Sequence, residues 1–280
     1  MSTEIATTGE LFSQAWEQYK VRALPILAVM LISTVLVGGS TLVLIFGGLI
    51  GGGVINHVTS SPAGAIILFG VVPVLFLLVT ALVFWSQTAL LALIVNEEMG
   101  LMDALHAGWQ YFWPMSKTIS ILLGIVLIGL ALGIVPGLIF IVWFSFGLFI
   151  LIDEDRPGLD GLLASREYVR GHGWDTFFKF VLIWAISLVA GIIPFAGQIF
   201  SFLFTPFLML YLLAIYRNLK AVKGEKAVVT TGRAGRLLWS CLAGLGLMLP
   251  VVGLLALMAA VVLHGQEWLL ELRQLMPPGY

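Results

Sequence analysis

The chain has little charge for its length. Only 10% of its 280 residues are charged, whereas a soluble domain carries about 25%. Apolar residues make up 60%, which is more than one globular core can hide from water. This composition excludes an ordinary soluble domain and indicates a protein whose solvent is a lipid bilayer.

Other scarcities exclude further classes of protein. The one cysteine, Cys241, has no partner for an internal disulfide, and its apolar neighbours lead us to expect a small buried residue rather than a reactive thiol. A net charge of −1 excludes the large positive field of a nucleic-acid-binding protein. Residues 1–19 contain acids but no basic residue, so we expect no secretory signal peptide.

The spacings that carry catalysis or metal binding are also missing. The four histidines are far apart, and none has the i, i+3 or i, i+4 spacing of a helical metal site. The acidic runs Glu97-Glu98 and Asp153-Glu154-Asp155 end apolar segments, and adjacent residues of a helix do not face each other. We expect these acids to be solvated in a salt-bridged layer, and we expect no catalytic residue, metal or cofactor.

What the chain does have is a series of long uncharged apolar runs without period-two alternation. Such runs predict membrane-spanning helices, because backbone groups in lipid must hydrogen-bond within the protein. We predict an all-α polytopic bundle of about seven spans. The predicted spans are Ala23–Phe46, Gly64–Val95, Thr118–Val135, Leu138–Ile152, Thr176–Ile193, Ile199–Tyr216 and Leu237–Leu263.

Two short turns join neighbouring spans into hairpins. Pro136 and Gly137 are predicted to connect the third and fourth spans, and the segment from Pro194 to Gly197 the fifth and sixth. The last span contains Pro250 and forms either one kinked helix or a re-entrant hairpin. We favour one span, because two halves of about 13 residues are each too short to cross the hydrocarbon core.

Basic residues define an orientation. Of the 14 Lys and Arg residues, all except Arg273 fall in or beside the loops on one side of the predicted spans, and the opposite loops are uncharged. Cytoplasmic loops carry the Lys and Arg excess, so we predict a cytoplasmic N-terminus. The predicted parts are a surface helix (1–22), a six-span module (23–216), a basic cytoplasmic linker (217–236) and a seventh span with an amphipathic tail (237–280).

A short amphipathic segment precedes the first, third and fifth spans. Residues 15–19, 108–112 and 165–169 each begin with a small residue and combine polar with aromatic residues. Thr7-Thr8-Gly9-Glu10 fits a capping box that starts the first of these helices. We predict three interfacial helices, which either anchor the protein or form a cytoplasmic collar that grips lipid or a partner.

The predicted spans contain no deep ionisable residue. Lys179 and Asp175 lie near a span end, where snorkelling reaches the surface, and the lack of buried charge counts against ion-coupled transport. Gln87 is the most conspicuous polar residue, and Gln198, Ser201 and Thr205 form a second polar stripe. These side chains serve either interhelical hydrogen bonds or a substrate path.

Several short motifs carry a family resemblance. They are Pro136-Gly137, Ile152-Asp153-Glu154, Gly158-Leu159, Ala164-Ser165, Tyr168-Val169-Arg170-Gly171, Leu210-Tyr211 and Tyr216-Arg217-Asn218-Leu219-Lys220. Together they resemble the multi-span membrane domain of some bacterial glycerophosphodiester phosphodiesterases and its free-standing, uncharacterised relatives.

The resemblance covers roughly Leu11–Lys220 and implies a six-helix module of the bacterial inner membrane. It does not imply phosphodiesterase activity, which in the fused proteins belongs to a separate soluble metal-dependent domain. The chain departs from the family after Lys220, and Arg166 stands where an aromatic residue is more usual.

We therefore expect a non-enzymatic accessory or scaffold protein of the bacterial inner membrane. Its expected partners are membrane lipids, with anionic headgroups attracted by basic residues, and a protein in the membrane or at its cytoplasmic face, but not nucleic acid. The alternative is a transporter or lipid-translocating protein for an apolar or amphipathic substrate, using Gln87 and Gln198. The candidate contact residues are Trp16, Trp109, Arg166, Arg170, Arg217, Lys220, Lys223, Lys226, Arg233 and Arg236.

Overall fold

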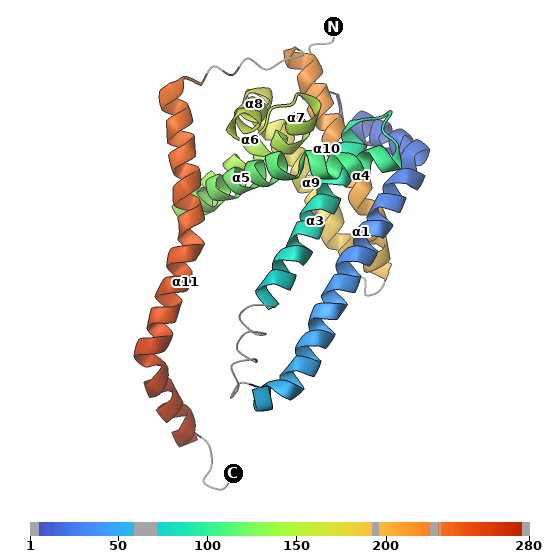
Figure 1. The fold of residues 1–280 in the computed structure, drawn as a ribbon. Helices are drawn as coiled ribbons and strands as arrows, with labels where there is room; N and C mark the ends of the chain where they lie inside the picture. Colours follow the sequence, from blue (N-terminus) through green and yellow to red (C-terminus); the bar gives the residue numbers. More distant parts are fainter. Residues whose placement is uncertain (1–5, 59–71, 192–195, 225–228, 230, 276–280) are drawn as a thin grey trace. The chain divides into compact units, whose positions relative to one another are not determined.

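The computed structural model describes residues 6–58, 72–191, 196–224, 229 and 231–275. Every regular element in this part of the chain is a helix (Figure 1), as the all-α prediction requires. The helices are α1 (Thr8–Val58), α3 (Val72–Val95), α4 (Leu101–Gln110), α5 (Phe112–Leu132), α6 (Ile134–Phe144), α7 (Gly147–Asp153), α8 (Leu159–Val169), α9 (Gly173–Gly191), α10 (Ala196–Lys223) and α11 (Arg233–Leu275).

Six segments within the described residues are long and apolar enough to cross a membrane. Their length and composition support a multi-pass membrane protein. They are Thr8–Leu42, Val74–Val95, Phe112–Leu132, Ile134–Asp153, Phe202–Lys223 and Arg233–Gly253. These six do not include α9, where the predicted fifth span lies up to Gly191, and the last two residues of that span are outside the described part of the chain, so the count of seven spans stays a prediction.

The chain forms two compact units. Unit 1 contains Met1–Thr118 and Val142–Val229, and unit 2 contains Ile119–Ile141 and Thr230–Tyr280. Within unit 1, α1 packs along α3, α9 packs along α10, α4 packs on α3 and α8 packs on α7 (Figure 1). We call the end of unit 1 that holds the C-terminal ends of α3, α7, α8 and α10 its polar end.

Burial in unit 1 changes along α3 and α10. In α3, Leu77 is 66% exposed, whereas Leu93 at the polar end is 0% exposed. The same change runs along α10, from Phe200 at 42% exposed to Leu210 at 1%, whereas α1 and α9 keep exposed apolar residues near that end, such as Leu24 and Trp174. A helix exposed on its apolar surface suits lipid, which solvates such side chains at no cost. The packed core of unit 1 therefore lies at its polar end.

The first helix confirms its predicted start and differs at its predicted end. Thr7 and Glu10 form the capping box reciprocally: the backbone N–H of Thr7 donates to the Glu10 carboxylate at 2.8 Å, and the N–H of Glu10 donates to the Thr7 hydroxyl at 3.4 Å. No loop separates the predicted surface helix from the first span, because α1 continues from Thr8 to Val58 through Pro25.

The turn after α5 lies earlier than we predicted. Gly133, at φ 143°, separates α5 from α6, and Pro136 and Gly137 lie in the first turn of α6. A proline is tolerated there because the first N–H groups of a helix have no partner within it. Gly133 takes the turn since residues with a side chain rarely adopt this positive φ. The second predicted turn, Pro194 to Gly197, has Gly197 in α10 and Pro194 outside the described residues.

Unit 2 contains a close crossing of α5 and α11. A side chain added at Gly246 would overlap the Gly124 backbone, and one added at Gly124 would overlap Ala243. Small residues permit such backbone approach between membrane helices. Helix α11 runs through Pro250 without interruption, so the re-entrant alternative for this segment is not observed.

Two expectations about burial were wrong. Cys241 is exposed, because only part of the α11 surface, including Trp239 and Ala243, is covered and a membrane span has apolar residues on its outer side as well. Lys179 does not snorkel: it is 3% exposed, bonds Asp175 at 2.5 Å and donates to the carbonyl oxygen of Ala6 at 3.4 Å.

Candidate functional site

Three basic residues of α10 reach the C-terminal ends of three other helices. Arg217, Lys220 and Lys223 follow one another at intervals of three residues, and each step of three rotates the side-chain direction by about −60° around a helix. The side chains therefore fan out from one helix toward α3, α7 and α8. We call these three residues the basic ladder of α10.

Arg217 caps α3. Its guanidinium donates to the backbone carbonyl of Val95 at 3.0 Å and forms an ion pair with Glu97. Arg22, from α1, donates to the neighbouring carbonyl of Asn96 at 3.0 Å. The last carbonyls of a helix lack partners within it and carry its negative dipole end, so two guanidinium groups satisfy and stabilise this end.

Lys220 meets the acidic end of α7. It pairs with Asp153, and it lies 3.5 Å from the Glu154 carboxylate. Tyr216, one turn earlier on α10, donates its hydroxyl hydrogen bond to Asp153 at 2.8 Å and to Glu154 at 3.0 Å. One helix thus presents a cation and a phenol to both carboxylates.

Glu154 is the most enclosed charge of this group. Its side chain is 2% exposed, Tyr168 of α8 donates to it at 2.6 Å, and Arg156 lies 3.4 Å from its second oxygen. A buried carboxylate requires such compensation, because its hydration is lost. We call Asp153, Glu154, Arg156, Tyr168, Tyr216 and Lys220 the acidic cluster.

Lys223 closes α8 in the same way. Its ammonium donates to the backbone carbonyl of Glu167 at 2.8 Å and to that of Arg170. These carbonyls lie at or just beyond the C-terminal end of α8 (Leu159–Val169). The three residues of the basic ladder therefore fix the ends of α3, α7 and α8 to α10.

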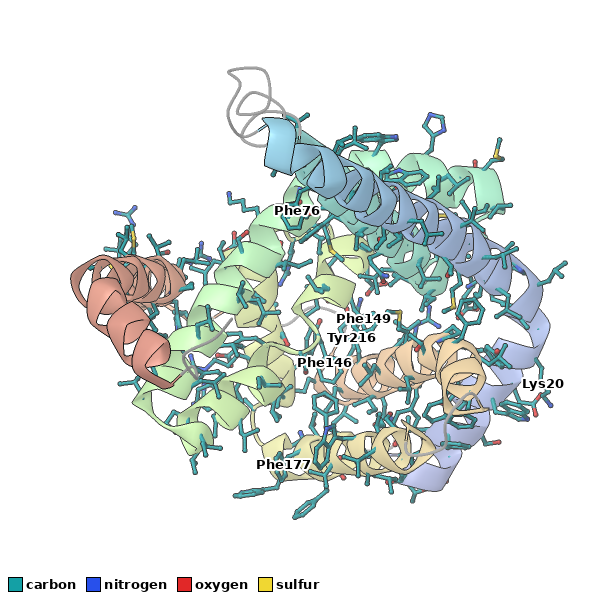
Figure 2. All side chains as sticks on the ribbon, turned by 90° about the horizontal axis from the view of Figure 1, so that it is seen from below. Lys20, Phe76, Phe146, Phe149, Phe177 and Tyr216 are labelled. Carbon is teal, nitrogen blue, oxygen red and sulfur yellow. The ribbon has the colours of Figure 1, made fainter. Side chains whose placement is uncertain are left out.

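The predicted fourth span is broken beside the acidic cluster. Helix α6 ends at Phe144 and α7 begins at Gly147. The buried hydroxyl of Ser165 donates to the Trp143 carbonyl at 2.8 Å and accepts from the Phe146 N–H at 3.1 Å. Irregular backbone in an apolar segment requires partners of this kind. Figure 2 shows Phe146 and Phe149 near Tyr216, with ring centroids 6.2 and 6.3 Å away.

The acidic cluster is arranged for holding helices together. Each carboxylate already meets at least one cation and one tyrosine hydroxyl. A general acid or base must instead present its proton site to a substrate. The geometry therefore ties α7, α8 and α10 into one unit, and the described residues include no group of His, Cys, Asp and Glu that could hold a metal ion.

The structure separates the predicted contact residues into groups. Trp16 and Trp109 are exposed, and the Arg170 side chain is 69% exposed. Arg166 lies over the Trp143 ring, 4.9 Å from its centroid. Arg217, Lys220 and Lys223 belong to α10 rather than to a linker, and their side chains have the intramolecular partners given above. Arg233 and Arg236 lie in α11, and Lys226 is outside the described residues.

The predicted polar path is described only in part. Gln87 is exposed on α3, while the hydroxyls of its neighbours Ser86 and Thr88 bond to backbone carbonyls of their own helix. Thr205 is exposed on α10. Gln198 and Ser201 also belong to α10, but their side chains are outside the described part.

The third predicted surface helix differs from the other two. Helix α8 has Arg166 at the place where α1 and α4 each expose a tryptophan, and it buries Leu162, Leu163, Ser165 and Tyr168. Tyr168 points its hydroxyl to Glu154, so an aromatic residue that looked interfacial serves the core.

Sequence reasoning missed the acidic cluster. We expected Glu154 to be solvated, and it is buried because Tyr168 and Tyr216 arrive from helices that sequence alone does not bring together. The available signal was the set of motifs that carries the family resemblance. Asp153, Glu154, Ser165, Tyr168, Tyr216, Arg217 and Lys220 all belong to those motifs, and all lie in the contacts described above.

The fold and this site define a class: a helical protein with segments able to cross a membrane and a cross-linked polar end. Comparison with protein-family models, with curated proteins and with solved structures gives no match in any of the three. The resemblance to the phosphodiesterase-associated membrane domain therefore stays a prediction from its motifs.

Proposed function

We propose that the protein is a non-enzymatic accessory or scaffold protein of the bacterial inner membrane, with a cytoplasmic N-terminus. Its polar end presents a fixed platform to a partner protein. The observation that carries this proposal is the basic ladder of α10, which ties the ends of α3, α7 and α8 together. Helices held at their ends offer a surface that loses little conformational entropy on binding.

The exposed charge of the platform fits a polar contact. Arg170 projects beyond α8 and pairs with Glu167 at 3.5 Å while staying 69% exposed. Exposed ion pairs of this kind add little to folding stability. Rim charges of this type instead set association rate and partner choice, so Arg170 is free to serve binding without a cost to the fold.

The test is purification from native membranes in mild detergent or nanodiscs, followed by mass spectrometry of everything that accompanies the protein. A stoichiometric protein partner is the expected result. Arg170→Glu should lower its recovery, whereas Lys117→Glu, an exposed basic control in unit 1 that is not among the candidate contact residues, should leave recovery and membrane localisation unchanged. A protein that emerges alone, with retained lipid or a small molecule, would contradict the scaffold proposal.

One observation favours the transport alternative. Gln87 exposes a carboxamide on α3, whose other polar side chains, Thr80, Ser86 and Thr88, bond to carbonyls of their own helix, and an unpaired amide in lipid is unfavourable. A path along Gln87 and Gln198 predicts that replacing both by Leu abolishes flux of an amphipathic substrate while folded protein remains in the membrane. Unchanged flux would remove this path.

A further inference from the structure

Exposed aromatic side chains lie at the boundary in unit 1 between the part with exposed apolar side chains and the packed core. Trp16 and Tyr19 of α1 stack at 5.8 Å and surround Phe207 of α10. Tyr19 donates its hydroxyl hydrogen bond to the Leu203 carbonyl at 3.1 Å. On α10, Leu203 is exposed and Phe207 is buried, so this group lies at the transition itself.

A second aromatic group marks the transition on α3. Trp85 donates its indole N–H to the Leu105 carbonyl of α4 at 3.2 Å, and its ring lies 6.3 Å from Trp109. Trp109 is 64% exposed. On α3, the apolar side chains before Trp85 include Phe76 and Leu77, which are 63% and 66% exposed, whereas all eight residues from Thr88 to Val95 are buried.

A third group stands at the start of α9. Trp174 is 76% exposed and lies 5.9 Å from Phe177 and 6.2 Å from Phe178. The next turn of α9 buries Thr176 and Lys179, and exposed apolar residues follow from Val181. Trp174 is therefore a third exposed tryptophan of unit 1, eight residues after Arg166, which is the residue that aligns with Trp16 and Trp109.

These groups point outward on different sides of unit 1. Figure 2, seen along the helices, shows Lys20 pointing out from α1 and Phe177 pointing out from α9, while Phe146, Phe149 and Tyr216 lie inside. One protein partner would cover one side. A bilayer surrounds every side at one depth, and Trp side chains prefer the headgroup level, where an apolar ring and a polar N–H are both satisfied.

We propose that the phospholipid headgroup layer meets unit 1 along Trp16, Trp109 and Trp174. The acidic cluster then lies on the aqueous side, and the apolar run Ala89–Val95 of α3 is buried in protein beyond the hydrocarbon layer. Gln87 lies at headgroup depth rather than at the midplane. This proposal rests on the membrane location proposed above and not on the partner protein.

The contact between unit 1 and the phospholipid headgroups depends on the exposed aromatic rings more than on the basic ladder. Arg217, Lys220 and Lys223 already bond to helix ends and acids. Lys20, one turn after Trp16 on α1, is half exposed and pairs with Glu17 at 2.7 Å. Interfacial binding through aromatic rings is governed by buried apolar area. We therefore expect the depth of these residues to be the same in zwitterionic and in anionic bilayers.

The test uses nitroxide labels in nanodiscs of phosphatidylethanolamine and phosphatidylglycerol, without any partner protein. Cys241→Ser leaves a background in which Met102→Cys, seven residues before Trp109 on α4, and Phe178→Cys, beside Trp174, are labelled one at a time. Leu77→Cys is the hydrocarbon control and Asp160→Cys the aqueous control. Collision with oxygen and with a water-soluble nickel complex gives the depth of each label.

We expect the Met102 and Phe178 labels to share one depth, between the two controls, and a Gln87→Cys label to match them. Labels at positions 102 and 178 that collide with nickel as readily as the Asp160 label would overturn the proposal, as would labels as deep as Leu77. Two positions keep the result usable if one variant does not fold. A nickel-accessible Leu77 label would instead contradict the membrane location itself.

Discussion

At the scale of single residues, Glu154 shows most clearly what the packing adds. Its carboxylate is buried between two tyrosines and two cations. Glu154→Gln leaves Lys220 and Arg156 without this charge. We expect the variant to lose about 2 kcal/mol of its free energy of unfolding. This is less than the loss for a wholly buried ion pair, because both cations are partly solvated.

For a chain of this length, that loss corresponds to a melting temperature in detergent about 4 °C lower. Asp155→Asn is the matched control, since it removes the same charge from the next residue. Asp155 is exposed and has a φ of 51°, which asparagine tolerates well. Equal melting temperatures for the two variants would contradict a special role for Glu154.

Ser165 makes a second residue-scale prediction. Ser165→Ala leaves the Trp143 carbonyl and the Phe146 N–H without their partner at the break between α6 and α7. We expect the free energy of unfolding to fall by about 1–3 kcal/mol, as for other unsatisfied buried polar groups. Ser145→Ala, which removes a hydroxyl bonded only to the Val142 carbonyl, should change the melting temperature less. A reversed order would show that the break does not depend on Ser165.

At the scale of helices, the basic ladder predicts separable effects. Arg217→Met should raise amide hydrogen exchange at the end of α3, and Lys223→Met should raise it at the end of α8, because each helix loses the donor on its last carbonyls. Hydrogen exchange with mass spectrometry of the detergent-solubilised protein measures both. If either variant raised hydrogen exchange equally throughout unit 1, the proposal that Arg217 and Lys223 each stabilise one helix end would be contradicted.

Helices were the part of the fold that sequence predicted best. Apolar runs of the right length predicted where α3, α5, α9 and α10 lie, and the capping box predicted the start of α1. The break after Phe144 was not predicted, since Ser145 and Phe146 are compatible with a helix and the partner, Ser165, comes from another one. The turn at Gly133 was assigned to Pro136 because a proline in the first turn of a helix resembles one in a loop.

At the scale of the whole chain, the continuity of α11 through Pro250 makes a prediction about topology. With a cytoplasmic N-terminus, a helix that crosses once places its C-terminal end outside. Alkaline phosphatase fused after Leu263 should be active, and the same fusion after Gly224 should be inactive while a fused green fluorescent protein is bright there. An inactive enzyme after Leu263 would favour a return to the cytoplasmic side.

For the candidate site, the sequence predicted which charged residues are present but not which of them pair. The sequence supplied the basic residues and the acidic run, and it placed them near one membrane surface. It led us to expect Arg217, Lys220 and Lys223 to be free for lipid, because positions in a chain do not reveal which helix end lies within reach. Their pairing with α3, α7 and α8 depends on how four helices meet.

The sequence alone determined that this is a helical protein suited to a bilayer, because composition and the length of apolar runs are local properties that lipid selects directly. Only the tertiary structure decided which charged side chains pair with other groups of the protein, which tryptophans remain exposed, and that α8 belongs to the core. Those outcomes depend on contacts between residues distant in the chain, as between Glu154 and Tyr216, and hydropathy along the chain contains no record of such contacts.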